Sequence, residues 1–235
     1  MRDGVYRFDA ATGRFEGAFG CGAEIRDPRG VRLSPDRSFV LVNNGDDRIL
    51  KFEAGSGKFL GSLSFRPGLN PGGGKFGWDG RYYVGSRSEK SIVAFDVASE
   101  REPSIFVPGN FMKFPRGLAA SPSGALYVAS GAHPITGEGE NTILRFDRDG
   151  HIDESFKVDD PGLSPLDIEV SPNGNLLSAS EVPFGGANAI TTVREYDKST
   201  GKLFRVFDAG GRSDGQRVSR LPRGITIGPD GALYS

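Results

Sequence analysis

The segment PRGLAASPSGALYV, residues 115–128, decides the fold, because it encodes one short hairpin that recurs along the chain. Apolar residues on both sides of the turn SPSG predict two strands. The turn itself suits a chain reversal, since Pro fixes φ and Gly accepts a positive φ. Related segments start at Pro28, Pro71, Pro165 and Pro222, and the copy at Pro71 is degenerate. The five prolines lie 43, 44, 50 and 57 residues apart, which indicates a repeat protein built from short antiparallel strands.

A second kind of hairpin alternates with the first. It starts with an apolar strand that ends in an aromatic residue and an acid, and a turn with Gly usually follows. Its five copies begin with VYRFD at residue 5, ILKFE at 49, IVAFD at 92, ILRFD at 143 and VREYD at 193. One hairpin of each kind makes a four-stranded sheet, and a unit of about 40–50 residues is typical of β-propeller blades. We therefore expect an all-β fold, a propeller of five four-stranded blades.

The order of the hairpins predicts how the ring closes. The chain begins with a hairpin of the second kind, at 4–19, and ends with one of the first kind, at 221–235. Pairing them completes the last blade and removes two open sheet edges. The alternative is that further blades follow Ser235. The single predicted domain, 1–235, has blades at approximately 27–65, 69–107, 113–158 and 163–208, and a fifth made of 221–235 plus 4–19.

The glycines of the Pro-x-Gly starts carry an expectation about packing. Gly117 and Gly224 should lie where the inner strands crowd near the axis, so a larger side chain at either position should destabilise the fold. The run Gly72–Gly74 offers the least side-chain packing and is expected to form the most mobile inner strand.

Composition excludes several classes of partner. Lys and Arg number 29, Asp and Glu 30, and the net charge is −1, so neither nucleic acid nor an anionic membrane is an implied partner. One Cys cannot form an internal disulfide framework. The start MRDG leads directly into a strand with no apolar signal segment. The cytoplasm is therefore the default location, and a signal trimmed from the N-terminus is the open alternative.

The repeat resembles the NHL-type propellers, including bacterial members related to the gluconolactonase and senescence-marker-protein group. The similar residues are the Pro-x-Gly start, the SPDG-like turn, the Leu-Tyr-Val strand and the Phe-Asp strand with its Thr-Gly turn. They are scaffold positions, so the resemblance implies the fold and leaves the activity open. Lactonases of this group hold one divalent metal in the channel, and this chain lacks their early Glu-Gly-Pro motif.

Strand alternation sorts the loops onto two faces. The Pro-x-Gly starts and the links between second and third strands share one face, which we call the top face. The SPDG-like turns and the Phe-Asp turns share the opposite face, the bottom face. The top carries the irregular sequence, including the loops at 43–47, 86–89, 131–140 and 181–189. Binding residues tend to lie on variable loops of a rigid scaffold, so the top face around the channel is the candidate site.

Arginines lead the candidate ligand-binding residues. The middle residues of three Pro-x-Gly starts are Arg29, Arg116 and Arg223. We expect them to surround the channel mouth, where the forked donors of their guanidinium groups suit a carboxylate or phosphate. The alternative is that they pair with Asp27, Asp167 or loop carbonyls. Further candidates on the top face are Asn43, Asn44, Arg87, His133, Asp167 and Glu181. The inner-strand charges Arg32, Lys75 and Glu169 are expected to pair across the channel.

Catalytic and metal motifs are weak. His133 beside Glu138, Glu140 and Glu181 offers one acid–base or metal cluster, and His151 should lie on the bottom face. The pattern GRSDG at 211–215 sits in a Gly-rich loop, not in the strand-to-helix elbow that a nucleophile motif needs. The acidic run 147–154 reads as an ordinary turn more than as a calcium loop. Cys21 is a lone thiol with no visible base.

The sequence therefore favours a binding or scaffold propeller that recognises a small-molecule or protein ligand on the top face near the channel. The alternative is a metal-dependent lactonase or hydrolase, or a lyase, of the gluconolactonase-like group. A divalent metal such as calcium belongs to that alternative alone.

Overall fold

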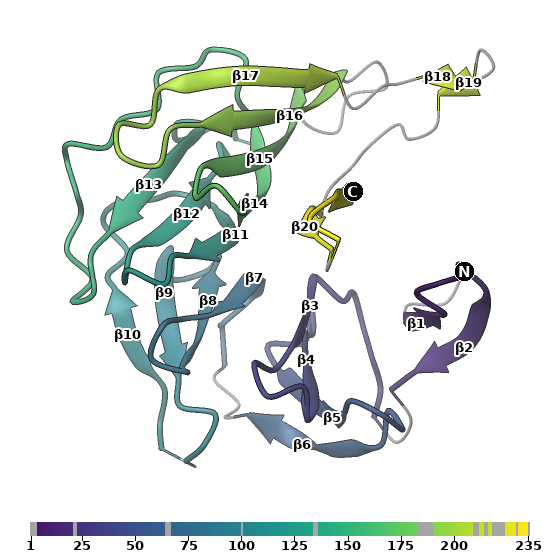
Figure 1. Ribbon diagram of the computed structural model, residues 1–235. Helices are drawn as coiled ribbons and strands as arrows, with labels where there is room; N and C mark the ends of the chain where they lie inside the picture. The colour runs from purple at the N-terminus through teal and green to yellow at the C-terminus, as the bar shows by residue number, and fades with distance from the viewer. Residues whose placement is uncertain are drawn as a thin grey trace.

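The computed structural model describes residues 4–20, 23–63, 67–99, 101–133, 136–182, 190–208, 212–213, 216–217, 224–228 and 230–234. All regular secondary structure in these ranges is β-strand, and the sheets follow one another around a common centre (Figure 1). No helix in the described residues could cross a membrane.

Three sheets have four strands, added in chain order from the centre outward. The first consists of β3 (Gly30–Leu33), β4 (Phe39–Asn43), β5 (Ile49–Glu53) and β6 (Phe59–Leu63). The second consists of β7 (Pro71–Phe76), β8 (Tyr82–Ser86), β9 (Ser91–Phe95) and β10 (Ser104–Val107). The last consists of β14 (Pro165–Val170), β15 (Leu176–Val182), β16 (Ile190–Tyr196) and β17 (Leu203–Asp208). A short pair, β18 (Arg212–Ser213) and β19 (Gln216–Arg217), follows.

The third sheet has three strands where the sequence predicts four. It contains β11 (Pro115–Ala120), β12 (Leu126–Ser130) and β13 (Thr142–Phe146), followed by one isolated bridge between Phe146 and Ile152. A turn ends the pairing there. The carboxylate of Asp153 accepts hydrogen bonds from the Ser155 amide at 3.0 Å and from Arg145 Nε at 2.9 Å. These bonds hold the chain in a turn where the fourth strand was expected.

Apolar clusters join each sheet to the next. One buries Leu41 of β4 with Tyr82 and Val93 of the second sheet, and comparable clusters lie between the second and third sheets and between the third and fourth. Middle strands bury both faces, so β8, β9 and β12 read as nearly continuous apolar runs. The core is therefore a set of layers between blades, as a repeat architecture requires.

The two terminal hairpins pack at the two ends of this series of sheets. Val5 and Phe19, from β1 (Val5–Phe8) and β2 (Phe15–Phe19), contact buried residues of β4 and β5. Ile225 and Ile227, next to and within β20 (Thr226–Ile227), contact buried residues of β15 and β16. Each hairpin thus neighbours the sheet that a fifth blade would neighbour.

The joined fifth blade is not formed in the described residues. β1–β2 and β20–β21, the latter ending at β21 (Leu233–Tyr234), are separate two-stranded sheets. β20 and β21 have two residues each, which leaves few backbone groups for a ladder to a third strand. The expected pairing of 4–19 with 221–235, the blade boundaries and the count of five remain predictions.

The Pro-x-Gly starts form bulges in the inner strands. The register between β11 and β12 shifts between Pro115 and Leu118, and β7 and β14 shift at the same place in their repeats. Pro can occupy the first position because it has no N–H to lose. A bulge leaves backbone groups unpaired and re-aims a side chain, so these segments point polar groups at the top of the channel.

Close packing explains the glycine run in β7. A Cβ on Gly73 would lie 2.7 Å from the Arg116 carbonyl oxygen, and one on Gly72 would lie 2.9 Å from that of Pro115. The absence of side chains therefore lets β7 lie directly against β11. Backbone contact with β11 therefore replaces the side-chain packing that Gly72–Gly74 lacks, and the expected mobility of this strand stays a prediction.

Candidate functional site

A cavity of about 700 Å³ lies on the top face where the inner strands begin. Its wall contains the third residue of all five Pro-x-Gly-type starts, which are Gly30, Gly73, Gly117, Asp167 and Gly224. It also contains Asp27, Pro28, Arg29, Val31, Arg32, Arg87, Phe114, Arg116 and Leu166. Five repeats therefore contribute equivalent positions to one space on the axis, and four of those positions carry no side chain.

Arg29 lines this cavity and also ties the first blade to the second. Its Nε donates to Asp27 Oδ2 at 2.9 Å, and its Nη1 donates to Asn70 Oδ1 and, at 3.4 Å, to the carbonyl oxygen of Pro71. Pro71 begins the next inner strand. The structural alternative raised from the sequence, pairing with Asp27 and loop carbonyls, is what Arg29 does.

Arg116 makes the equivalent link from the third blade to the fourth. Its Nη1 donates to the Pro165 carbonyl oxygen at 2.9 Å and its Nη2 to that of Ala132 at 3.1 Å. The side chain is almost fully buried and lies over the Phe114 ring, 5.4 Å from its centroid. Gly131 is required beside it, because a Cβ there would overlap the guanidinium. Arg116 is therefore a bond between blades as well as part of the cavity wall.

Arg87 replaces the arginine that the second blade lacks. The Pro-x-Gly start of that blade has Gly72 in the middle, and a Cβ on Gly72 would lie 3.4 Å from Arg87 Nε. Arg87 enters from the β8–β9 turn and lies over the Phe114 ring at 5.1 Å. Its Nε is buried without a hydrogen-bond partner among the described residues. Burial, reinforced by the charges of Arg29 and Arg116, lowers the pKa of Arg87 to about 10.

Asp167 is the exception among the five wall positions. Its carboxylate accepts hydrogen bonds from the Ile168 amide at 3.0 Å and from the Ile225 amide of the C-terminal hairpin at 3.2 Å. Arg32 Nη2 lies 3.7 Å away. Burial raises the pKa of this carboxyl, and the Arg32 charge opposes that rise. Asp167 places a negative pole in a cavity whose rim is positive.

The inner-strand charges pair across the channel as the sequence predicts. Lys75 Nζ of β7 lies 2.6 Å from Glu169 Oε1 of β14, and Arg32 of β3 faces Asp167. Glu169 also lines a hollow on the bottom face, whereas Lys75 lines neither space. The pair lies two residues further along β7 and β14 than Gly73 and Asp167 of the cavity wall.

Asn43 and Asn44 are structural residues. Both are fully buried and neither lines the cavity. Asn43 Nδ2 donates to the Gly72 carbonyl oxygen at 2.8 Å, and its Oδ1 accepts from the Tyr82 hydroxyl at 3.0 Å. Asn44 Oδ1 accepts from the Arg26 amide at 2.7 Å. These amides hold loops and neighbouring blades in place.

His133 and Glu181 also lie outside the cavity wall. The His133 ring packs edge-on against Phe114, with centroids 5.5 Å apart, and its Nδ1 accepts from the Thr136 amide at 3.2 Å. Glu181 is fully buried in β15, and its amide donates to the Ser164 carbonyl oxygen at 3.1 Å. Neither candidate therefore lines the described cavity wall, although His133 contacts Phe114, the ring over which Arg87 and Arg116 lie.

Arg223 and Cys21 fall outside the described residues, and of the GRSDG pattern at 211–215 the structure describes Arg212 and Ser213 alone, as β18. Phe114 is the cavity residue that sequence reasoning missed. The available signal was its position directly before Pro115, which matches that of Asp27 before Pro28. An aromatic ring there gives Arg87 and Arg116 a common surface.

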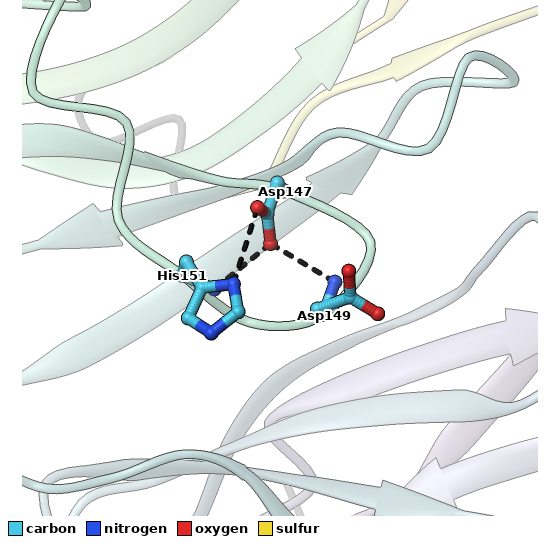
Figure 2. Close-up of side chains that lie close together, drawn as sticks. All are labelled: Asp147, Asp149 and His151. Carbon is cyan, nitrogen blue, oxygen red and sulfur yellow. Dashed lines mark hydrogen bonds and ion pairs between the residues drawn. The ribbon is translucent and has the colours of Figure 1, made fainter.

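One group of side chains on the bottom face has ligand types that suit a metal. Figure 2 shows Asp147, Asp149 and His151 on the turn after β13, with His151 Nδ1 3.3 Å from Asp147 Oδ2. All three are exposed, and the backbone amides of Asp149 and His151 donate to Asp147 Oδ1. This is the ordinary repeat turn predicted from the sequence. His151 and His133 accordingly lie on opposite faces.

The top cavity does not suit a divalent cation. Calcium takes six to eight oxygen ligands, whereas the charged groups in the described part of this wall are four arginines and two aspartates. A larger hollow of about 880 Å³ lies on the bottom face between the third and fourth blades. The stereotyped turns line this hollow, and the guanidinium of one of its lining arginines, Arg145, already donates to the Asp153 carboxylate.

Comparisons with known proteins identify the class of fold. Neither the family models nor the curated proteins compared with this sequence match it. Among solved structures, a streptogramin B lyase has a TM-score of 0.67 at 18% identity, over 98% of this chain and 68% of its own. A catalytically inactive histidine-to-alanine form of virginiamycin B lyase from Staphylococcus aureus, with quinupristin, has 0.68 at 16%, over 98% and 69%. Hydrazine synthase of Kuenenia stuttgartiensis has 0.66 at 21%, over 91% and 57%.

These likenesses show an all-β propeller fold. The chain spans 57–69% of the length of the three structures it is similar to. At these identities they say nothing about the chemistry of this chain.

Proposed function

We propose that this propeller binds a small anionic molecule, through a carboxylate or phosphate group, in the arginine-lined cavity of its top face. The observation that carries the proposal is Arg87. Its guanidinium stands at the cavity wall without an ion pair or a partner for Nε among the described residues, in the field of two further arginines. Like charges held close together repel, and an anion between them removes that cost.

The charge balance of the wall supports an anion. Arg29, Arg32, Arg87 and Arg116 oppose Asp27 and Asp167, which leaves an excess of two positive charges among the described lining residues. Asp27 already pairs with Arg29, and Asp167 faces Arg32. Arg87 therefore has no carboxylate ion pair within the described wall. Planar forked donors of this kind suit bidentate contact with carboxylate and phosphate oxygens.

The volume of the site favours a small molecule over a protein ligand. Its four described arginines line one cavity of about 700 Å³, and pockets of roughly 300–1,000 Å³ are typical for small ligands. The NHL-like resemblance allows a protein partner on the same loops. Such a partner would need an inserted acidic side chain to reach Arg87.

The test compares Arg87→Gln with Arg148→Gln by calorimetric titration with inorganic phosphate at low ionic strength. Arg87→Gln removes the charge and leaves a polar side chain of similar reach. Loss of one charge-assisted hydrogen bond should weaken binding about 10- to 100-fold. Arg148 is the matched control, because it lies in the larger hollow of the bottom face.

The proposal requires Arg148→Gln to bind phosphate as the parent does. It fails if Arg87→Gln binds equally well, or if phosphate and acetate give no binding heat. Alanine at Arg29 and Arg116 does not make a clean test, because these side chains also join neighbouring blades. The melting temperature should be nearly unchanged in Arg87→Gln, since among the described residues that side chain contacts another blade through the Phe114 ring and makes no hydrogen bond to one.

A lyase is the second candidate, and the position of His133 is the observation behind it. The His133 ring contacts Phe114, which lines the cavity. Of the two histidines in the described residues, His133 is the one on the top face. Incubation with quinupristin, followed by mass spectrometry, tests this function. Linear product that disappears in His133→Ala would establish the lyase and replace the binding proposal.

A further inference from the structure

We propose that the ligand of the top cavity carries a hydrogen-bond donor, an ammonium or hydroxyl group, at the end opposite its anionic group, and that Asp167 receives this donor. The inference rests on the proposed anion site and adds the class of molecule. It assigns Asp167 as a specificity-determining residue.

Equivalent repeat positions lie at successive depths of the cavity. The second residues of the starts form the rim, where Arg29 and Arg116 lie and where Arg87 fills the place above Gly72. The third residues form the wall and are Gly in four repeats. Two residues further along their strands, Lys75 and Glu169 form an ion pair at 2.6 Å. Four of the five third positions leave space for a ligand because they carry no side chain.

Among the five third residues of the starts, Asp167 is the one that has a side chain. Its carboxylate has about four acceptor sites. Two are used by the amides of Ile168 and Ile225, and Arg32 lies at 3.7 Å, beyond a strong hydrogen bond. Capacity for a further donor therefore remains on a carboxylate that lines the cavity.

The two ends of a bound ligand would contact different blades. Arg87 comes from the second blade and Asp167 from the fourth, with the third blade between them. A molecule that places its anion at Arg87 extends away from the rim toward Asp167. The Asp167 carboxylate would repel a second anionic group at that end, a repulsion that the Arg32 guanidinium 3.7 Å away partly offsets, whereas it would bind an ammonium or hydroxyl group. The wall thus favours an amino acid or hydroxy acid over a dicarboxylate.

The experiment uses probes matched in length, with end groups as the variable. The amino acids are β-alanine, 4-aminobutyrate and 6-aminohexanoate. The dicarboxylates are malonate, succinate and adipate, and the monocarboxylates are propionate, butyrate and hexanoate. Because the ligand length is set by the cavity, one length should stand out. At that length the amino acid should bind about 10-fold or more tighter than the dicarboxylate.

Asp167→Asn provides the second readout. It keeps an oxygen for one of the two backbone amides, which donate to different carboxylate oxygens, and it removes the charge. The preference for the amino acid over the dicarboxylate should then fall to within about 3-fold. Phosphate affinity should be retained. Asp149→Asn, an exposed carboxylate on the bottom face, is the control and should leave every probe unchanged.

The outcomes separate the two proposals. If phosphate binding depends on Arg87 but dicarboxylates bind as tightly as amino acids, the anion site stands and the role of Asp167 is overturned. The role is also overturned if Asp167→Asn keeps the preference. Should this variant fail to fold, the preference series on the parent protein decides alone. If neither phosphate nor any acid binds, both proposals fall.

Discussion

Replacing Gly117 with alanine tests whether backbone contact between inner strands stabilises the ring. A Cβ at this position would lie 2.5 Å from Asp167 Cα and 2.9 Å from the Ile168 amide nitrogen. Carbon atoms normally approach to about 3.5–4.0 Å, so β11 and β14 would have to separate by roughly 1 Å. The obstacle is backbone on a neighbouring strand, so the cost should lie near the upper end of the usual overpacking range, about 3 kcal/mol.

Thermal unfolding followed by circular dichroism measures this effect. For a domain of this size, about 3 kcal/mol corresponds to a fall in melting temperature of roughly 5–10 °C. Gly55→Ala is the control, because that glycine has open space around it and no positive φ. It should melt within about 2 °C of the parent. A Gly117→Ala protein that melts with the parent, or a Gly55→Ala protein that falls as far, would refute the argument.

The same measurement separates Gly117 from Gly224. The sequence predicts that both crowd the axis, and for Gly224 this is wrong among the described residues. A Cβ there would meet Asp167 Oδ2 at 3.8 Å, which is an ordinary contact. Gly224→Ala should therefore be tolerated, although it occupies the equivalent place in the repeat. Equal destabilisation of the two variants would mean that the fifth start is packed as tightly as the third.

Two further predictions concern the charges of the channel. Lys75→Met leaves Glu169 largely buried without its partner and should cost about 2 kcal/mol, less than for a fully buried pair because Lys75 is partly exposed. Adding Glu169→Gln should recover part of this loss, and denaturant titrations that show no recovery would contradict a paired role. Burial raises the pKa of Asp167 above 3.8, so between 3.8 and the raised value the folded state binds more protons than the unfolded state. Stability relative to Asp167→Asn should therefore fall as pH rises through that window and then level off; a difference that is constant from about pH 4 to 8 would contradict this.

Part of the candidate site could be predicted from the repeat alone. Equivalent positions in a closed set of repeats lie at equal radius, so Arg29 and Arg116 could be assigned to one space from their spacing, and both do line it. Arg87 could be assigned to the same face and is in the same wall. The pairing of Lys75 with Glu169 followed from the cost of unpaired inner charges.

The roles of the individual polar side chains could not be predicted. Asn43 and Asn44 satisfy backbone groups of loops and of the next blade, and His133 lies behind Phe114. Which group bonds to which depends on rotamers and on distances between blades. Sequence spacing does not encode these quantities.

The sequence by itself determined that this protein is made of alternating short hairpins, because Pro, Asp and Gly at fixed offsets impose turns and apolar alternation imposes strands. It also predicted that Arg29, Arg87 and Arg116 lie on one face, and these three residues line one cavity. Only the tertiary structure decided that the third sheet has three strands, that the terminal hairpins form separate two-stranded sheets in the described residues, and that Arg87 fills the space above Gly72. These features depend on long-range contacts between blades. A change of about 1 Å in the distance between two blades decides whether a side chain forms a hydrogen bond to the next blade or keeps its donor available.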